Sequence, residues 1–165
     1  MRRIVLAVLL PALIAGVAGI AVATPGSGIS TVNLLAPIAS GRFDQIEVNA
    51  ETDSYELELR TKGLSDVHVV RNTFDPGGHS GWHSHPGPSL ITVTSGTITN
   101  YDGDDPTCTP HVYSAGMGFI DQGGSHVHLI RNEGSAPAVT VAVQLLPAGA
   151  SRRIDVTPPP VDCGF

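Results

Sequence analysis

Residues 77–96 read GGHSGWHSHPGPSLITVTSG, and this stretch decides the fold. It carries two histidines spaced two apart, His83 and His85, and then a β-branched run, Ser89–Ser95. Residues two apart on a strand point to the same face, so the two imidazoles project together and Trp82 packs on the opposite side. The surrounding glycines and prolines are typical of turns between short strands. This stretch therefore predicts β-structure with a histidine pair on one face.

A second pair, His126 and His128, begins a predicted strand at residues 126–132. If both pairs face one interior, four imidazoles converge there. Imidazole nitrogens bind zinc, copper, iron and nickel, and three or four of them make a coordination shell. The pattern predicts a site for a divalent transition metal, with iron, zinc, nickel, copper and manganese all open. The alternative is that both pairs lie on strands that face solvent.

The chain has three further histidines. His79 lies in the glycine-rich loop before the first pair and is a candidate acid/base, or else a solvated loop residue. His68 and His111 have no neighbouring ligand in the sequence, and we expect them to be ordinary polar residues. His126 is a candidate for two roles, either a fourth metal ligand or a base beside the metal.

The rest of the chain is a series of short runs separated by turns, with 19 glycines and 13 prolines. None of these runs after the N-terminal segment has a sustained helical apolar period, so an antiparallel sandwich or barrel is predicted. In residues 138–146 larger apolar residues alternate with smaller or polar ones, which predicts a strand with one buried face. Further strands are predicted at Tyr55–Leu59, Asp66–Phe74, Ser89–Ser95, Thr97–Tyr101, His111–Ser114 and Met117–Asp121.

The N-terminus has the three parts of a secretory signal peptide. Arg2 and Arg3 precede an apolar run that ends in Ala21-Val22-Ala23, so residues 1–23 are predicted to be a cleaved signal. An uncleaved membrane anchor is the alternative, because the run is long enough to span a bilayer. Either reading places the protein outside the cytoplasm, secreted or in the cell envelope.

The predicted location affects the state of the two cysteines and the net charge of the mature chain. Cys108 and Cys163 would meet an oxidising compartment, where a disulfide is the usual outcome and two free thiols the alternative. Closing that loop would stabilise the fold by about 4 kcal/mol. Loss of Arg2 and Arg3 with the signal takes the formal charge from −6 to −8, with Lys62 as the only lysine. This balance excludes nucleic acid as a partner, since phosphate backbones bind basic surfaces.

The two histidine pairs resemble the two motifs of the cupin superfamily. The first motif is glycine, five residues, His-x-His, three or four residues, glutamate, six residues and glycine. Gly77, His83-Ser84-His85 and Gly96 fit it, and Ser89 stands where the glutamate belongs. The second motif ends in histidine, three residues and asparagine, which His128 and Asn132 match, while its Pro-x-Gly start is blurred.

The resemblance, which covers roughly residues 67–146, implies an all-β, jelly-roll-like antiparallel barrel with a metal held by His83, His85 and His128. The Pro/Gly/Ser/Thr content of residues 24–40 predicts a linker or arm before a barrel at 41–150, and the prolines near the end predict a C-terminal tail at 151–165. Because Ser89 is a poor ligand, the glutamate's carboxylate is expected to be missing from the shell. The site is then either three-histidine, as in cupin dioxygenases that act on thiols or diketones, or completed by His126.

Two functions follow and stay open at this point. The first is an exported metal-dependent oxygenase that acts on a small polar or anionic molecule, because a divalent ion held by neutral imidazoles keeps its full charge. The second is a non-catalytic metal- or small-molecule-binding module of the cell envelope. Cupins are often dimers, so a homodimer is expected as well. A membrane partner is expected only if residues 1–23 stay attached.

Overall fold

The computed structural model describes residues 25–165, and in this range it contains strands and no helix. The predicted signal peptide, residues 1–23, lies outside the described residues. Within residues 25–165, nothing could cross a bilayer as a helix. The thirteen strands are β1 (Ser27–Asn33), β2 (Gly41–Phe43), β3 (Glu47–Thr52), β4 (Tyr55–Arg60), β5 (Ser65–His79), β6 (His83–Ser84), β7 (Ser89–Ser95), β8 (Thr97–Asp102), β9 (His111–Ser114), β10 (Gly118–Asp121), β11 (His128–Arg131), β12 (Ala138–Pro147) and β13 (Ile154–Asp155).

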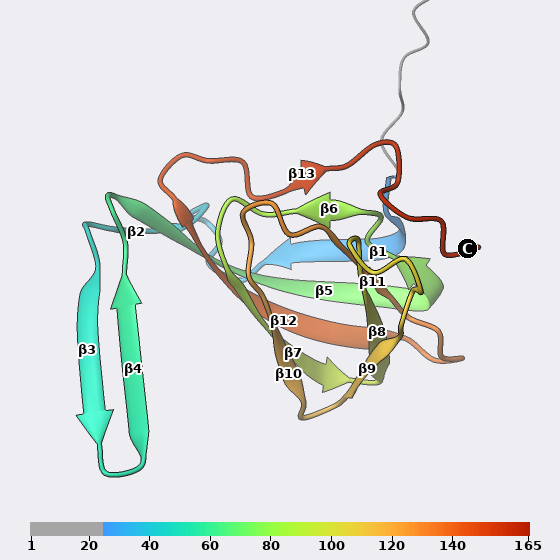
Figure 1. The fold of residues 1–165 in the computed structure, drawn as a ribbon, viewed down its shortest axis with the longest axis horizontal. Helices are drawn as coiled ribbons and strands as arrows, with labels where there is room; N and C mark the ends of the chain where they lie inside the picture. Colours follow the sequence, from blue (N-terminus) through green and yellow to red (C-terminus); the bar gives the residue numbers. More distant parts are fainter. Residues whose placement is uncertain (1–24) are drawn as a thin grey trace, which may run out of the picture.

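The strands form an antiparallel sheet that is nearly closed into a barrel (Figure 1). One side is the run β10–β7–β12–β5, and β1 and β2 add to β5. The other side has β11 between β8 and β6, with β9 beyond β8 and β13 beyond β6. The long strand β5 belongs to both sides, because it pairs with β12 along most of its length and its last residue, His79, pairs with Arg131 of β11. The predicted all-β barrel is confirmed.

The barrel interior is apolar at one end and polar at the other. On β12 the buried positions include Ala138 and Leu146, but also Thr140 and Gln144, while Val143 on the other face is 40% exposed. The alternation along this strand therefore turns its smaller and more polar face inward. The apolar core consists of two clusters, Phe74, Val93, Ile98, Ile130 and Ala138, and Val70, Ile91 and Ala142.

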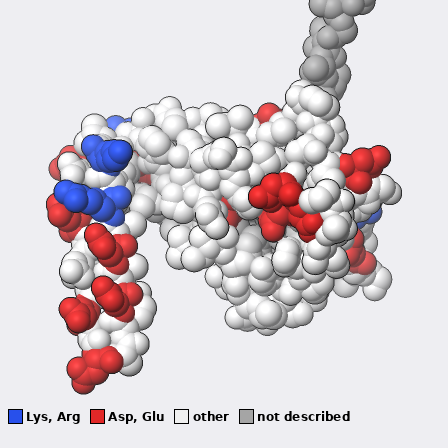
Figure 2. Space-filling view, viewed as in Figure 1, with Lys and Arg blue, Asp and Glu red and all other residues white. Residues whose placement is uncertain are grey.

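The hairpin β3–β4 projects away from the barrel (Figure 1). Its register pairs Val48 with Leu59 on one face and Glu51 with Glu56 on the other, so the hairpin has an apolar face and an acidic face. Figure 2 shows the acidic side chains following this hairpin, with basic ones at its base. Val48 and Leu57 are both at least 40% exposed, so the apolar face has no partner within the described part of this chain.

The C-terminal segment lies over the outside of the barrel. β13 pairs with β6, which places Asp155 opposite His83, and the Val156 amide donates to the Trp82 carbonyl oxygen. The predicted disulfide between Cys108 and Cys163 is present and ties this segment to the loop after β8. Its residues pack on a cluster of buried side chains outside the barrel, Trp82, Tyr101 and Leu129.

One strand prediction is wrong at its start. The strand expected from His126 begins at His128. Gly123 and Gly124 both have positive φ, and the His126 amide still donates to the Gly123 carbonyl oxygen. The backbone is therefore still turning at His126, and the rule that residues two apart share a face does not apply to this pair.

Candidate metal centre

Short strands bring the first histidine pair beside the second motif. His83 starts β6 and lies directly opposite His128, the first residue of β11. Residues opposite each other on antiparallel strands have their side chains about 5 Å apart. His85 follows β6 by one residue and points to the same side as His83, as the two-residue spacing predicts.

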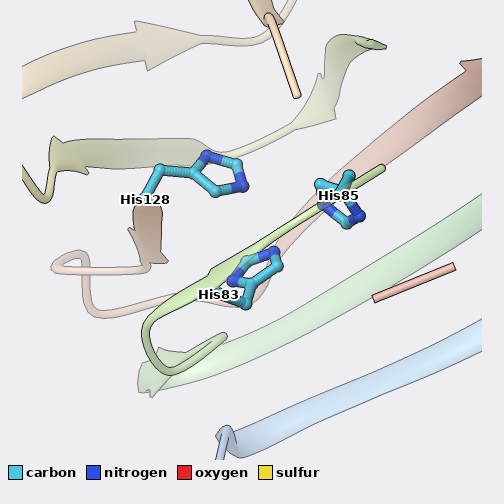
Figure 3. Close-up of side chains that lie close together, drawn as sticks. All are labelled: His83, His85 and His128. Carbon is cyan, nitrogen blue, oxygen red and sulfur yellow. The ribbon is translucent and has the colours of Figure 1, made fainter. Parts of the chain in front are cut away.

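Figure 3 shows the rings of His83, His85 and His128 turned toward one another, and their ligand atoms all lie within 4.8 Å of one another. The ring centroids of His83 and His128 are 4.4 Å apart, and those of His83 and His85 are 4.8 Å apart. All three residues are buried. Within the described residues, these are the three histidines whose nitrogens could hold one ion.

Each ring is fixed from behind by an oxygen acceptor at Nδ1. The acceptors are the Gly81 carbonyl at 2.9 Å for His83 and the Arg152 carbonyl at 2.6 Å for His85. For His128 the acceptor is the Asn100 side-chain oxygen, at 3.0 Å. A carbonyl oxygen can only accept, so Nδ1 of His83 and of His85 carries the proton. Each Nε2 then keeps its lone pair, and such outer hydrogen bonds are how metal-binding histidines are held.

Burial keeps these rings neutral. Removal from water holds the pKa of His83 and of His128 well below the ordinary histidine value, and it also lowers the pKa of His85. A neutral imidazole is the form that binds a metal ion. The buried Nε2 of His128 has no hydrogen-bond partner in the part of the chain that the structure describes. An unpaired buried nitrogen is costly, and a metal ion would give it a partner.

A cavity of about 250 Å³ adjoins the three histidines. Ser89, Gln144, Arg152 and Arg153 are among the other residues that line it. Arg153 forms an ion pair with Asp155. Arg152 donates to the Gln144 side-chain oxygen at 3.1 Å and has no carboxylate within ion-pair distance among the described residues. The cavity thus joins the histidine nitrogens to an arginine whose charge is not neutralised.

A buried carboxylate, Asp121, also faces the three-histidine group, and the sequence analysis missed it. Its Oδ2 lies 3.8 Å from Nε2 of His85 and 3.9 Å from Nε2 of His128. Ser89 predicts that the motif's own carboxylate is missing from the metal shell, and the structure places a different carboxylate beside the histidines. The available signal was an acidic residue at the end of an otherwise apolar strand, but only the pairing of β10 with β7 places it here.

His126 lies beside the three-histidine group but is turned to other partners. Its Nδ1 is 2.9 Å from Oδ1 of Asp121, and its Nε2 is 3.4 Å from Oδ1 of Asp102. With both nitrogens facing carboxylates, His126 is placed beside the proposed ligands rather than among them. His111, expected to be an ordinary polar residue, has Nε2 3.5 Å from Oδ2 of Asp102.

His79, the other acid/base candidate, lies on the far side of β6. Its Nδ1 accepts a hydrogen bond from the Gly81 amide, and the ring lines a pocket with Trp82 and Phe165 beneath the C-terminal segment. The structure therefore does not bring His79 to the cavity of the three-histidine group.

The comparison with protein-family models agrees with this architecture. Residues 70–144 match the family model described as a cupin domain. No protein of curated function matches the chain significantly. Among solved structures, an uncharacterised conserved protein with a double-stranded β-helix domain from Klebsiella pneumoniae is 25% identical, with 69% of this chain and 86% of that chain covered and a TM-score of 0.47.

Two further solved structures are similar. The cupin domain of an XRE-family transcriptional regulator from Enterobacter cloacae is 13% identical, over 73% of this chain and 99% of that chain, with a TM-score of 0.46. An oxalate oxidase is 24% identical, over 55% of this chain, with a TM-score of 0.47. The match spans only 46% of the oxalate oxidase chain.

Proposed function

Since the chain belongs to the cupin superfamily, we propose that it holds a divalent transition metal ion on Nε2 of His83, His85 and His128 and acts as an oxygenase on a small anionic molecule. The observation that carries the metal-binding part of the proposal is the commitment of each Nδ1 to an oxygen acceptor, which leaves the Nε2 atoms of three clustered histidines for one ion. A bound ion would supply Lewis acidity to oxygen atoms beside it.

The cavity supports an anionic substrate. Arg152 lines it, has no acidic partner among the described residues, and is held by the Gln144 side chain. Burial lowers the pKa of Arg152, but an arginine stays charged at any physiological pH. A carboxylate or similar group would pair with this guanidinium while its other end reached the histidine group. Two variants test this pairing. Arg152→Gln removes the positive charge and should lose substrate binding, whereas Arg152→Lys keeps the charge and should retain it.

The metal site is tested by elemental analysis of natively purified protein. We expect about one metal ion per chain in the wild type and none in the His83→Ala/His85→Ala variant. The matched controls are His68→Ala and His111→Ala, which change histidines outside the group and should keep the metal. Equal metal content in all four proteins would contradict the site.

A non-catalytic metal-binding module is the second candidate function, and the disulfide is the observation that supports it. A disulfide is typical of compartments that lack cytoplasmic reductants, which some oxygenases need. Oxygen uptake by the metal-loaded protein, measured with small carboxylates, thiols and diketones, separates the two functions. Iron with uptake supports the oxygenase, whereas stoichiometric zinc without turnover supports the binding module.

Export is part of the proposal. The disulfide is compatible with an oxidising compartment, and the N-terminal residues have the composition of a signal peptide. N-terminal sequencing of protein recovered from outside the cytoplasm is expected to start at Thr24. A start at Met1 in a membrane fraction would support the anchor instead.

We also propose a homodimer formed through the β3–β4 hairpin. An isolated two-stranded hairpin is marginal in water, and this one exposes an apolar face. The barrel exposes a matching surface, a row of paired residues across β10, β7 and β12 formed by Ile120, Leu90 and Val143, each at least 40% exposed. Each chain thus has both halves of an apolar contact that a second copy would complete.

Sedimentation velocity tests this contact. Leu57→Glu places a charge on the apolar face of the hairpin and should convert the dimer to monomer. Glu56→Gln, on the acidic face one residue away, is the matched control and should leave the dimer intact. A monomeric wild type, or a dimer unaffected by Leu57→Glu, would refute the hairpin contact.

A further inference from the structure

The carboxylate that the first cupin motif lacks in this chain is present on the neighbouring strand. Ser89, where the motif has glutamate, starts β7, and Asp121 ends β10 directly opposite it. Directly paired residues on an antiparallel pair project from the same face. Both side chains are buried in the barrel, Ser89 at 0% and Asp121 at 1% exposure.

We propose that Asp121 supplies the fourth ligand of the metal site, through Oδ2. This assignment rests on the metal site proposed above. It changes the character of the centre, because the ligand set becomes three histidines and one carboxylate although the motif's glutamate is serine.

The two oxygens of Asp121 have different surroundings. Oδ1 accepts hydrogen bonds from the Gly123 amide at 3.1 Å and from Nδ1 of His126 at 2.9 Å. Oδ2 is buried and has no hydrogen-bond partner among residues 25–165. These two hydrogen bonds fix the rotation of the carboxylate, so Oδ2 is held toward the histidine nitrogens.

The distances suit two ligands of one ion rather than a hydrogen bond. Oδ2 is 3.8 Å from Nε2 of His85 and 3.9 Å from Nε2 of His128, beyond hydrogen-bond reach. Two ligand atoms each about 2.1 Å from one ion can be at most about 4.2 Å apart, and both separations of Oδ2 are within this limit. The three histidine nitrogens, which lie within 4.8 Å of one another, would close slightly around the ion. The buried Nε2 of His128 also lacks a hydrogen-bond partner among the described residues. One cation between them would satisfy both unpaired atoms.

Asp121→Asn isolates the role of Oδ2. The amide oxygen can still accept the Gly123 and His126 hydrogen bonds, while the second oxygen becomes an NH2 group that cannot bind a cation. Loss of an outer hydrogen-bond partner lowers metal affinity about 10- to 100-fold, so loss of a direct ligand is expected to cost at least about 100-fold. The affinity is measured with Zn²⁺ and Co²⁺ by chelator competition on the oxidised mature protein.

A second variant returns a carboxylate to the site from β7, the strand that pairs with β10. Asp121→Asn combined with Ser89→Glu places the acid at the motif position, beside the same cavity. We expect this double variant to recover affinity to within about tenfold of the wild type, since its ligand set matches in charge. The visible absorption of bound Co²⁺ should change in Asp121→Asn and return toward the wild-type spectrum in the double variant.

Asp102→Asn is the matched control. Asp102 is the other carboxylate that contacts His126, and its side chain forms no ion pair or hydrogen bond with His83, His85 or His128, although its backbone pairs with His128. The amide oxygen of asparagine can still accept the hydrogen bond from the Asn100 side chain. This change should leave metal affinity within about threefold. Circular dichroism at each step verifies that the variants are folded.

The possible outcomes distinguish a failure of the Asp121 assignment from a failure of the metal site itself. A large loss in Asp121→Asn, with rescue by Ser89→Glu, supports the assignment. Wild-type affinity and an unchanged Co²⁺ spectrum in Asp121→Asn, with metal lost in His83→Ala/His85→Ala, overturn the role of Asp121 and leave the three-histidine site standing. If the wild type binds neither ion, the proposed function and this assignment both fail.

Discussion

Removing the Cys108–Cys163 disulfide is expected to loosen the metal site as well as destabilise the fold. The two cysteines are separated by 55 positions. For a closed loop of that length, the loss of denatured-state entropy is worth about 4 kcal/mol at 25 °C. In a domain of this size, each kcal/mol shifts the melting temperature by roughly 2–4 °C, so the loss is expected to be about 8–16 °C.

The effect on the site follows from what the tethered segment holds. β6 has only two residues and carries His83, and β13 in the C-terminal segment is one of its two strand partners. The Val156 amide also donates to the Trp82 carbonyl oxygen, next to His83 in sequence. Without the disulfide this segment detaches more often, and His83 is then held by β11 alone. Metal affinity should therefore fall along with stability.

The assay compares oxidised and reduced wild type with a Cys108→Ser/Cys163→Ser variant. Thermal melts followed by circular dichroism give the stability, and chelator competition gives the metal affinity. Reductant should lower the melting temperature of the wild type and slow its migration on a denaturing gel, while the double serine variant, which is its own control, should not respond. A reduced wild type that melts within about 2 °C of the oxidised protein would refute the entropic argument.

Three further changes test other parts of the structure. Asn100→Ala removes the oxygen acceptor behind the third histidine, His128, and should lower metal affinity about 10- to 100-fold in chelator competition, whereas His68→Ala, which changes a histidine outside the group, should bind normally. Gly123→Ala would place Cβ 2.2 Å from a backbone oxygen and should lower the melting temperature well beyond Gly124→Ala, which has the same positive φ but open space around it; equal effects would contradict the close approach. Hydrogen bonds from Arg42 lower the pKa of Asp66, so the carboxylate stabilises the fold above its ordinary pKa and this contribution is lost as pH falls through the lowered value. The gap in melting temperature between wild type and Asp66→Asn should therefore be large at pH 7 and shrink below about pH 4, and a gap that stays constant with pH would argue against it.

His83 and His85 were predictable because their geometry is local, whereas His128 was predicted from its match to the second cupin motif. His83 and His85 are two residues apart, and the strand period alone puts them on one face. The same reasoning failed for His126, because β11 starts two residues later, after a turn through two glycines. A spacing rule depends on where the strand begins, and strand ends are the least certain part of a prediction from sequence.

Asp121 was not predictable because its place depends on pairing between strands. It is far from Ser89 in the sequence, and only the register of β10 on β7 makes the two residues neighbours. The hairpin strand Glu47–Thr52 was missed for a related reason, since its alternation is weak and shows a face only when paired with β4. The sequence also could not show that β12 turns its more polar face inward. That orientation depends on contacts with distant residues, since the buried Gln144 side chain donates to Ser89 and accepts from Arg152.

The polar end of the barrel links the stability of this fold to its site. Burying Asp121 with one oxygen unpaired, beside a histidine nitrogen that is also unpaired, costs about 1–3 kcal/mol for each neutral group and more for a charged one. Replacing these residues with apolar ones would remove that cost, so their presence is poorly explained by packing alone. A cation between them would turn the unpaired atoms into ligands, and its binding free energy would then count toward folding, because the unfolded chain does not hold these groups together. The same atoms that make the metal-free barrel less stable are therefore the ones through which a bound ion would stabilise it.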